Sequence, residues 1–155
     1  MKMNDNYMFD IKRTRDEFIL RLFSLDLKER LLLGSIYEQP EISCLGYLEY
    51  KNIFIDNMLG LLKSDLIHCV NKLCQYDFLM YDPHFNLLYL NDYLIRFPLK
   101  NANEGQKVER HFYKLTKKVN FYPILACDLL KMPFLTKSFR RNLKEYLYDL
   151  MDESK

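Results

Sequence analysis

The sequence has no tryptophan and few glycines, cysteines and histidines: four, four and three among 155 residues. The glycines are scattered, so the chain has no glycine-rich loop of the kind that cradles a phosphate. No apolar run approaches the roughly 18 residues that a membrane-spanning helix needs. The N-terminal residues also lack the apolar core of a signal peptide. These absences predict a protein that has no membrane partner and works in the cytoplasm.

The cysteines do not follow the spacing of a disulfide framework. Cys44, Cys69, Cys74 and Cys127 stand among apolar residues, so we expect reduced core thiols in a cytosolic protein. His68 precedes Cys69, but adjacent positions on a helix point about 100° apart and cannot easily share one metal ion. No Ser/His/Asp or Cys/His set stands out. The sequence therefore predicts no metal, no cofactor and no enzymatic activity.

The formal net charge is only +2, so the chain is no polycation. Residues 31–100 contain five basic and eight acidic side chains, whereas residues 101–155 contain 11 basic and seven acidic ones. The middle of the chain is therefore mildly acidic and the last third is basic. Because the phosphates of nucleic acid attract basic surfaces, this asymmetry argues against the simplest DNA-binding arrangement, in which the middle segment acts alone.

The stretch 64–91 organises the rest of the chain. Its first half has apolar residues that recur at steps of three and four, which predicts an amphipathic helix with Ser64 as its N-cap. The apolar stripe of this helix consists of Leu66, Ile67, Val70, Leu73 and Cys74. Residues 78–81 and 87–90 are aromatic and apolar, as in short strands. Asp, Pro and Asn within residues 82–86 favour a tight turn between them. The stretch thus reads as a helix that leads directly into a β-hairpin.

Two helices are predicted ahead of this stretch. Residues 15–23 have apolar side chains on one side, which indicates a short helix. Asp26 and Glu29 have the spacing of a capping box, which predicts the start of a second helix. Pro40 ends that helix, and Gly34 inside it suggests a close helix crossing.

A strand and a third helix complete the order. Residues 43–51 alternate enough to form a short strand. Asn52 can cap the next helix, which Gly60 helps to end. The order helix, strand, helix, helix, strand, strand is that of a winged helix-turn-helix. The predicted fold class is therefore mainly α with a small antiparallel β-sheet: a winged helix-turn-helix followed by a C-terminal helical extension.

The remainder of the chain is predicted to be helical. Residues 99–107 resemble a polar linker, and a basic helix is expected over residues 107–119. Pro123 opens another helical segment, which Pro133 closes, and residues 138–151 form a last helix. Three parts follow from this pattern: an N-terminal arm and short helix at 1–23, a winged-helix domain at 24–100 and a basic helical extension at 101–155.

Three stretches carry a family resemblance: ERLLLGSIYEQPEISCLGYLEY, VNKLCQYDFLMYD and LLYLNDYLIRFPLKNANEGQKVERHFYKL. Through them, residues 27–115 resemble the N-terminal winged-helix domain of phage replisome organisers, the replication-initiation proteins of phages of low-GC bacteria. The resemblance implies a domain that binds double-stranded origin DNA in the host cell cytoplasm and helps to recruit a replicative helicase or its loader. The chain departs from the family in having no tryptophan and few Arg or Lys residues in the helix that would enter the groove.

The candidate DNA-binding residues of that helix lie on its polar side: Lys63, Ser64, His68, Asn71, Lys72 and Gln75. The two amide side chains could pair with adenine edges, and His68 or Lys72 could meet guanine or phosphate. Asp65, at the same end of the helix, would be repelled by phosphate. In the hairpin turn, His84 and Asn86 could touch the DNA backbone or the minor groove. The alternatives are a solvated helix face and ordinary turn chemistry.

The basic extension supplies the remaining candidates: Lys107, Arg110, Lys114, Lys117 and Lys118. The first four are spaced by three and four residues, so on one helix they would share a face. Contacts to phosphate need only such a row of charge, because they do not read the sequence. The alternative is a solvated helix on which Glu109 is interspersed.

Two other functions stay open. The acidic middle segment and the many aromatic residues suit a protein-interaction module, such as a phage-encoded inhibitor of a host defence nuclease of the CRISPR type. A transcriptional regulator is the third reading. The last helix has an apolar face that could pack on its own domain or on a second copy in a homodimer. That face consists of Phe139, Leu143, Tyr146, Leu147 and Leu150.

Overall fold

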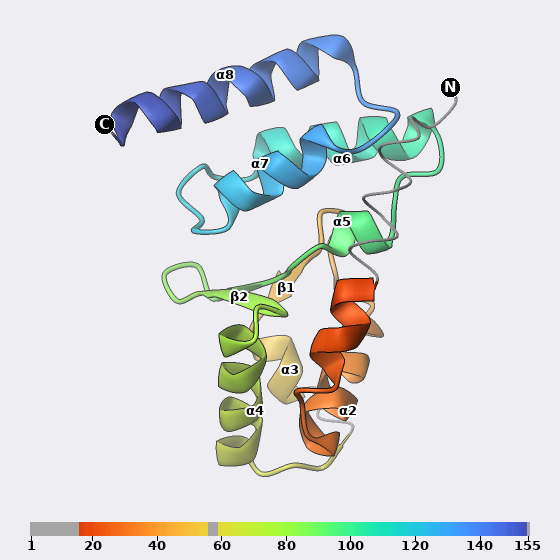
Figure 1. Ribbon diagram of the computed structural model, residues 1–155, viewed down its shortest axis with the longest axis vertical. Helices are drawn as coiled ribbons and strands as arrows, with labels where there is room; N and C mark the ends of the chain where they lie inside the picture. The colour runs from red at the N-terminus through yellow and green to blue at the C-terminus, as the bar shows by residue number, and fades with distance from the viewer. Residues whose placement is uncertain (1–15, 56–58, 155) are drawn as a thin grey trace. The chain divides into compact units, whose positions relative to one another are not determined.

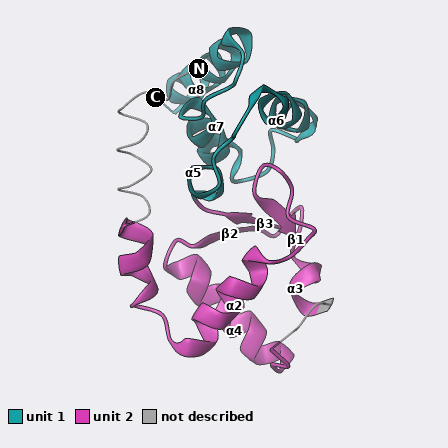
Figure 2. Cartoon of the chain, turned by 90° about the vertical axis from the view of Figure 1, so that its right-hand side faces the viewer, with its two compact units in different colours: residues 1–14, 92–155 teal, residues 15–91 magenta. Residues whose placement is uncertain are grey.

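The computed structural model describes residues 16–55 and 59–154 (Figure 1). The chain is mainly helical with one small three-stranded antiparallel sheet, which confirms the coarse fold class. The described residues fall into two compact units (Figure 2): unit 2 extends to Asn91, and unit 1 begins at Asp92. The sequence-based boundaries at residues 24 and 101 stay predictions.

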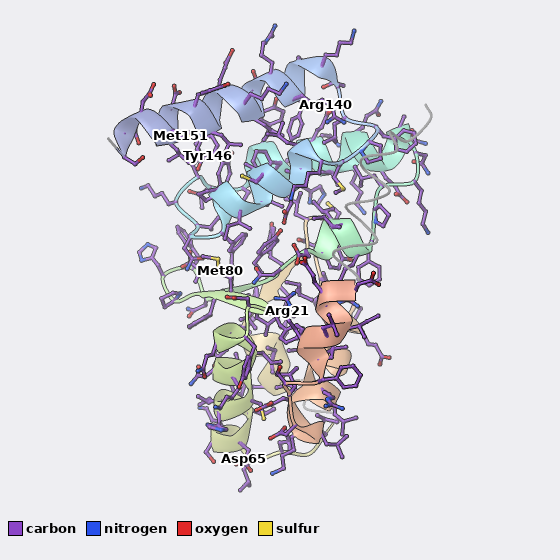
Figure 3. The ribbon with its side chains drawn as sticks, in the orientation of Figure 1. Arg21, Asp65, Met80, Arg140, Tyr146 and Met151 are labelled. Carbon is purple, nitrogen blue, oxygen red and sulfur yellow. The ribbon has the colours of Figure 1, made fainter. Side chains whose placement is uncertain are left out.

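Unit 2 contains a helical segment at residues 16–22 and three further helices: α2 (Leu27–Tyr37), α3 (Lys51–Ile55) and α4 (Lys63–Gln75). Helix α2 packs against α4, and both helices have buried apolar residues: Leu32, Leu33 and Ile36 on α2, and Leu66, Val70 and Leu73 on α4. Arg21, labelled in Figure 3, fastens the first helical segment to the end of α4. Its Nη1 donates hydrogen bonds to the carbonyl oxygens of Tyr76 and Asp77 at 3.4 and 3.1 Å.

The start of α2 is the capping box that the sequence predicted. Asp26 Oδ1 accepts the backbone N–H of Glu29 at 2.9 Å, and Glu29 Oε2 accepts that of Asp26 at the same distance. These bonds satisfy two groups that the first helical turn would otherwise leave unpaired. The expected close crossing at Gly34 is wrong, since a Cβ placed there would meet no heavy atom within 4 Å.

The sheet has the order β1-β3-β2, formed by β1 (Tyr47–Glu49), β2 (Leu79–Asp82) and β3 (Leu87–Leu90). The central strand pairs antiparallel with both neighbours, so Leu88 lies opposite Leu48 and Tyr81. The two leucines and the tyrosine at positions 88–90 of the central strand are all buried. The hairpin at 78–90 is therefore confirmed, and the first strand is shorter than the predicted 43–51.

Two helix starts in unit 2 differ from the prediction. Helix α4 begins at Lys63, and its N-cap is Leu62, which has no side-chain acceptor, so Ser64 is not the cap. Asn52 lies inside α3 because that helix already begins at Lys51. The predicted continuation of this helix through residues 56–58 lies outside the described residues.

The described part of unit 1 contains α5 (Tyr93–Arg96), α6 (Ala102–Lys114), α7 (Tyr122–Leu130) and α8 (Lys137–Glu153). The predicted linker at 99–107 is wrong, since α6 starts within it. Asn101 caps α6 by accepting the N–H of Glu104 at 3.0 Å, and Gly105 is buried in the helix. The predicted basic helix to residue 119 is also too long, because α6 ends at Lys114. The helix opened by Pro123 is confirmed.

The core of unit 1 lies between α6, α7 and α8. Its buried side chains are aromatic and aliphatic, and they include Phe112, Phe121, Leu125, Leu129, Phe139 and Leu143. Two polar links hold the segment before α8. Glu109 Oε1 accepts the N–H of Thr136 at 2.6 Å, and Arg140 (Figure 3) donates to the carbonyl oxygens of Leu130 and Met132. Among the helices of the two described ranges, none combines the length and apolar character that a bilayer crossing requires.

Candidate nucleic-acid interface

The polar side of α4 is exposed on unit 2. Of the six candidates on this helix, five side chains are exposed and Lys72 is half-buried. The opposite side holds Leu66, Val70 and Leu73 in the core. The same periodicity that defines the apolar stripe therefore brings the candidates onto one solvent-facing surface. Asp65, in the first turn of α4 (Figure 3), adds the negative charge expected there.

The hairpin turn after α4 is held by its own side chains. Asp82 is buried, and its Oδ1 accepts the N–H groups of His84 and Phe85 at 2.9 and 3.0 Å. Asn86 has φ 53°, in the left-handed region that Asn tolerates better than most residues, and its Oδ1 accepts the Tyr81 hydroxyl at 3.1 Å. The candidates His84 and Asn86 are both exposed. These hydrogen bonds fix the backbone conformation of the turn from which His84 and Asn86 project.

Sequence reasoning missed a hollow beside this surface. It is lined by the first turns of α4, by α3 and by the hairpin turn, with Tyr50, Phe54, Ile67 and Phe85 as its apolar walls. Ile67 is 37% exposed although its position in α4 fits the apolar stripe of that helix. The sequence assigned Ile67 to the apolar stripe, since its spacing fits the helix core. Nothing in the spacing indicated that α3 and the turn would leave it open.

The basic candidates divide into two groups within unit 1. Lys107, Arg110 and Lys114 are exposed on α6 at steps of three and four residues. Lys117 and Lys118 follow the end of the helix, so the predicted row of four on one helix face is wrong at Lys117. Glu109 is engaged with the Thr136 N–H rather than with this row. Three cations therefore share the surface of α6.

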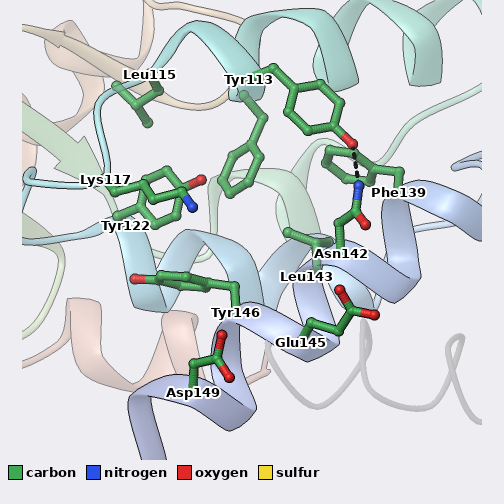
Figure 4. A pocket seen from close by; sticks show the side chains of 11 residues that line it. Tyr113, Leu115, Lys117, Tyr122, Phe139, Asn142, Leu143, Glu145, Tyr146 and Asp149 are labelled. Atoms are coloured by element: carbon green, nitrogen blue, oxygen red, sulfur yellow. Dashed lines mark hydrogen bonds between the residues drawn. The ribbon is translucent and has the colours of Figure 1, made fainter. Parts of the chain in front are cut away.

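Lys117 belongs to an aromatic pocket instead (Figure 4). Its Nζ lies 5.7 Å from the centroid of the Tyr146 ring. The Tyr146 ring meets Tyr122 edge-on at 4.9 Å, and Tyr122 stacks on Phe112 at 4.6 Å. The pocket has a volume of about 350 Å³ and lies between α6, α7 and α8. No spacing rule could have found it, because its rings come from three different helices and meet only through the way these helices pack.

Two phenols of this pocket, those of Tyr122 and Tyr146, have raised pKa values. Tyr122 is only 4% exposed, and burial raises its pKa to about 12. Burial and the nearby carboxylate of Glu153 also raise the pKa of Tyr146. On the far wall, Asn142 Nδ2 donates to the Tyr113 hydroxyl at 2.9 Å. The pocket therefore offers aromatic faces and uncharged hydroxyls.

The thiols and imidazoles do not gather into a metal site. Within residues 16–55 and 59–154, no group of three or more His, Cys, Asp or Glu side chains is arranged to hold an ion. Cys69 is buried and Cys74 is half-buried, and desolvation raises the pKa of both thiols. The prediction of four core thiols is wrong for Cys127, which is exposed on α7.

Comparisons with known proteins found no match to this chain among protein-family models, curated proteins or solved structures.

Proposed function

We propose that unit 2 is a winged helix that binds double-stranded DNA through α4 and the hairpin turn. The observation that carries the proposal is the exposed polar face of α4, which leads directly into the β2–β3 hairpin. The element order and the sheet order β1-β3-β2 support it, because a winged helix has both. In such folds the helix before the hairpin enters the major groove.

The side chains on α4 suit base reading better than phosphate binding. Asn71 and Gln75 are one helical turn apart, and each offers the paired donor and acceptor that matches an adenine edge. His68 lies one turn before them on the same face. Lys63 and Lys72 are the only basic residues of α4. The three basic residues on α6 would then supply sequence-blind contacts to phosphate.

The biological role that we propose is replication initiation in a phage or mobile element. It rests on the resemblance of residues 27–115 to replisome organisers. Under this proposal the protein binds origin DNA and recruits a helicase or a helicase loader.

The test is to select tightly bound duplexes from a random-sequence pool and to compare two double variants by fluorescence anisotropy. Asn71→Ala with Gln75→Ala should weaken binding to the selected duplex about tenfold or more, since each good bidentate pair contributes about 1–3 kcal/mol of discrimination. Binding to unselected duplex should change little. The matched control, Asn103→Ala with Gln106→Ala, removes the same two side-chain types from exposed positions on α6.

Two results would count against the proposal. One is the absence of duplex binding at low salt, where phosphate contacts are strongest. The other is an equal loss in the control pair, which would mean that α4 does not read the bases.

A protein-interaction module is the second candidate, favoured by the hollow beside α4. Its aromatic and aliphatic walls are typical of a surface that binds another protein. Residues 15–91 also contain 11 acidic and seven basic residues, a net charge of −4 that disfavours DNA. A stoichiometric host protein that stays bound at high salt to the parent chain but not to Ile67→Asp would support this reading, as expected for an inhibitor of a host nuclease.

A further inference from the structure

The aromatic pocket of unit 1 has the composition of a site for a positively charged group. Five aromatic rings line it, with neighbouring centroids 4.6 to 5.6 Å apart: Phe112, Tyr113, Tyr122, Phe139 and Tyr146. Phe112, Tyr122 and Phe139 are buried in this packing, so Tyr113 and Tyr146 are the rings that an entering group can reach. The face of an aromatic ring carries partial negative charge and attracts cations within about 6 Å of its centre. The accessible rings of Tyr113 and Tyr146 therefore favour a cation over a neutral molecule of the same shape.

The charges at the pocket support the same choice. Glu145 and Asp149 are exposed on α8 and line the opening (Figure 4). Lys117 is the only cation among the lining residues. Tyrosine hydroxyls are uncharged at neutral pH, and burial raises the pKa of Tyr122 and Tyr146 further above that range. The permanent charges that face an incoming group are thus two carboxylates and one ammonium.

The single ammonium marks where a cation would bind. Lys117 Nζ lies 5.7 Å from the centroid of Tyr146, within reach of a cation–π interaction. The Lys117 side chain follows the end of α6 and is exposed, so it can leave this position for solvent. An external cation that contacts Tyr146 must displace it or share the ring with it.

We propose that this pocket binds an organic cation, a quaternary ammonium or a guanidinium group, in competition with Lys117. The volume of about 350 Å³ is near the lower end of the range for small-molecule sites, which suits a head group with a short stem. This function is separate from DNA binding, because the acidic rim and the ring faces repel phosphate.

The experiment titrates the full chain with choline chloride and follows the ¹H–¹³C resonances of the tyrosine rings by NMR. Choline should shift the resonances of Tyr113 and Tyr146, the two accessible rings of the pocket. Its neutral isostere, 3,3-dimethylbutan-1-ol, should bind at least about threefold more weakly, since it lacks the charge that the rings attract. Sodium chloride at equal ionic strength corrects for screening. Arginine amide provides the guanidinium probe, and the tighter of the two cations identifies the head group.

Three variants make the test specific. Lys117→Gln should tighten choline binding about two- to fivefold by removing the competitor. Lys118→Gln is the matched control, because Lys118 is also exposed but does not line the pocket. Asp149→Asn should weaken binding. Equal affinity for choline and its isostere would overturn the proposal, and so would a Lys117→Gln variant that binds no more tightly than Lys118→Gln.

Discussion

Gly105 and Gly34 are both helical glycines, but their surroundings differ. A Cβ on Gly105 would collide with the backbone carbonyl oxygen of Phe134, whereas a Cβ on Gly34 would have open space. The sequence suggested the reverse, with Gly34 at a helix crossing and Gly105 in a linker. The sequence does not show which atoms surround a glycine. Gly105 differs from Gly34 because the segment before α8 packs against α6 at Gly105.

Alanine at these two positions should therefore have opposite effects on stability. Gly34→Ala should raise the free energy of unfolding by up to about 1 kcal/mol, because alanine is the better helix former. Gly105→Ala gains the same propensity but overpacks a backbone contact, at a cost of about 1–3 kcal/mol, so we expect a net loss. Urea denaturation of both variants measures the difference. A stabilised Gly105→Ala chain would show that Phe134 does not pack on α6.

At the scale of the helix, capping explains which starts could be predicted. Asp26 and Glu29 gave the start of α2 because both side chains bond to the backbone as the spacing requires. A similar pattern, Asn-x-x-Glu, is present at Asn101 and Glu104. There Asn101 Oδ1 accepts the Glu104 N–H at 3.0 Å, and Glu104 Oε2 accepts the Lys100 N–H at 2.7 Å. Gly105 next to it led to the linker reading instead. Helix α4 starts at a leucine cap, for which the sequence has no signal.

The charged residues of helix α8 are arranged unfavourably with respect to the helix dipole. Its first half contains only basic charges and its second half only acidic ones: Lys137, Arg140, Arg141 and Lys144, then Glu145, Asp149, Asp152 and Glu153. The N-terminal end of a helix carries partial positive charge and the C-terminal end partial negative charge. Both ends of α8 are therefore electrostatically unfavourable.

Reversing a terminal charge on α8 should stabilise the protein. Lys137→Glu and Glu153→Lys should each raise the free energy of unfolding by about 0.5–1 kcal/mol at low salt, with a smaller gain at high salt. Lys144→Glu is the control, since the effect of the dipole is confined to the terminal turns. Thermal unfolding at two salt concentrations measures all three variants. A gain in Lys144→Glu as large as in Lys137→Glu would assign the effect to net charge.

At the scale of the whole molecule, the candidate sites differ in how far the sequence could define them. The α4 surface follows from one helical period, so its residues could be named before the fold was known. The aromatic pocket needs α6, α7 and α8 to converge, and residues such as Tyr113 and Tyr146 are too far apart in sequence for a spacing rule. The sequence assigned Tyr146 only to an apolar stripe, although it also forms the pocket wall.

The charge of the chain is segregated between its two units. Residues 15–91 have a net charge of −4, whereas residues 92–155 contain 13 basic and eight acidic side chains, a net charge of +5. Phosphate attraction by the proposed DNA-binding protein must therefore come mainly from unit 1. Base reading by α4 and phosphate binding by α6 would then be separate functions, so a substitution could abolish one of them and leave the other intact.

This separation predicts the salt dependence of DNA affinity. Each phosphate contact contributes about 0.9 to the slope of log affinity against log salt concentration. The triple variant Lys107→Gln, Arg110→Gln and Lys114→Gln should lower the steepness of that slope by up to about 2.7 on unselected duplex. The matched control removes three exposed cations from α8, through Lys137→Gln, Arg141→Gln and Lys144→Gln. If the slope of the control variant falls as much, the attraction is due to net charge, because the α6 cations would then contact phosphate no more than those of α8.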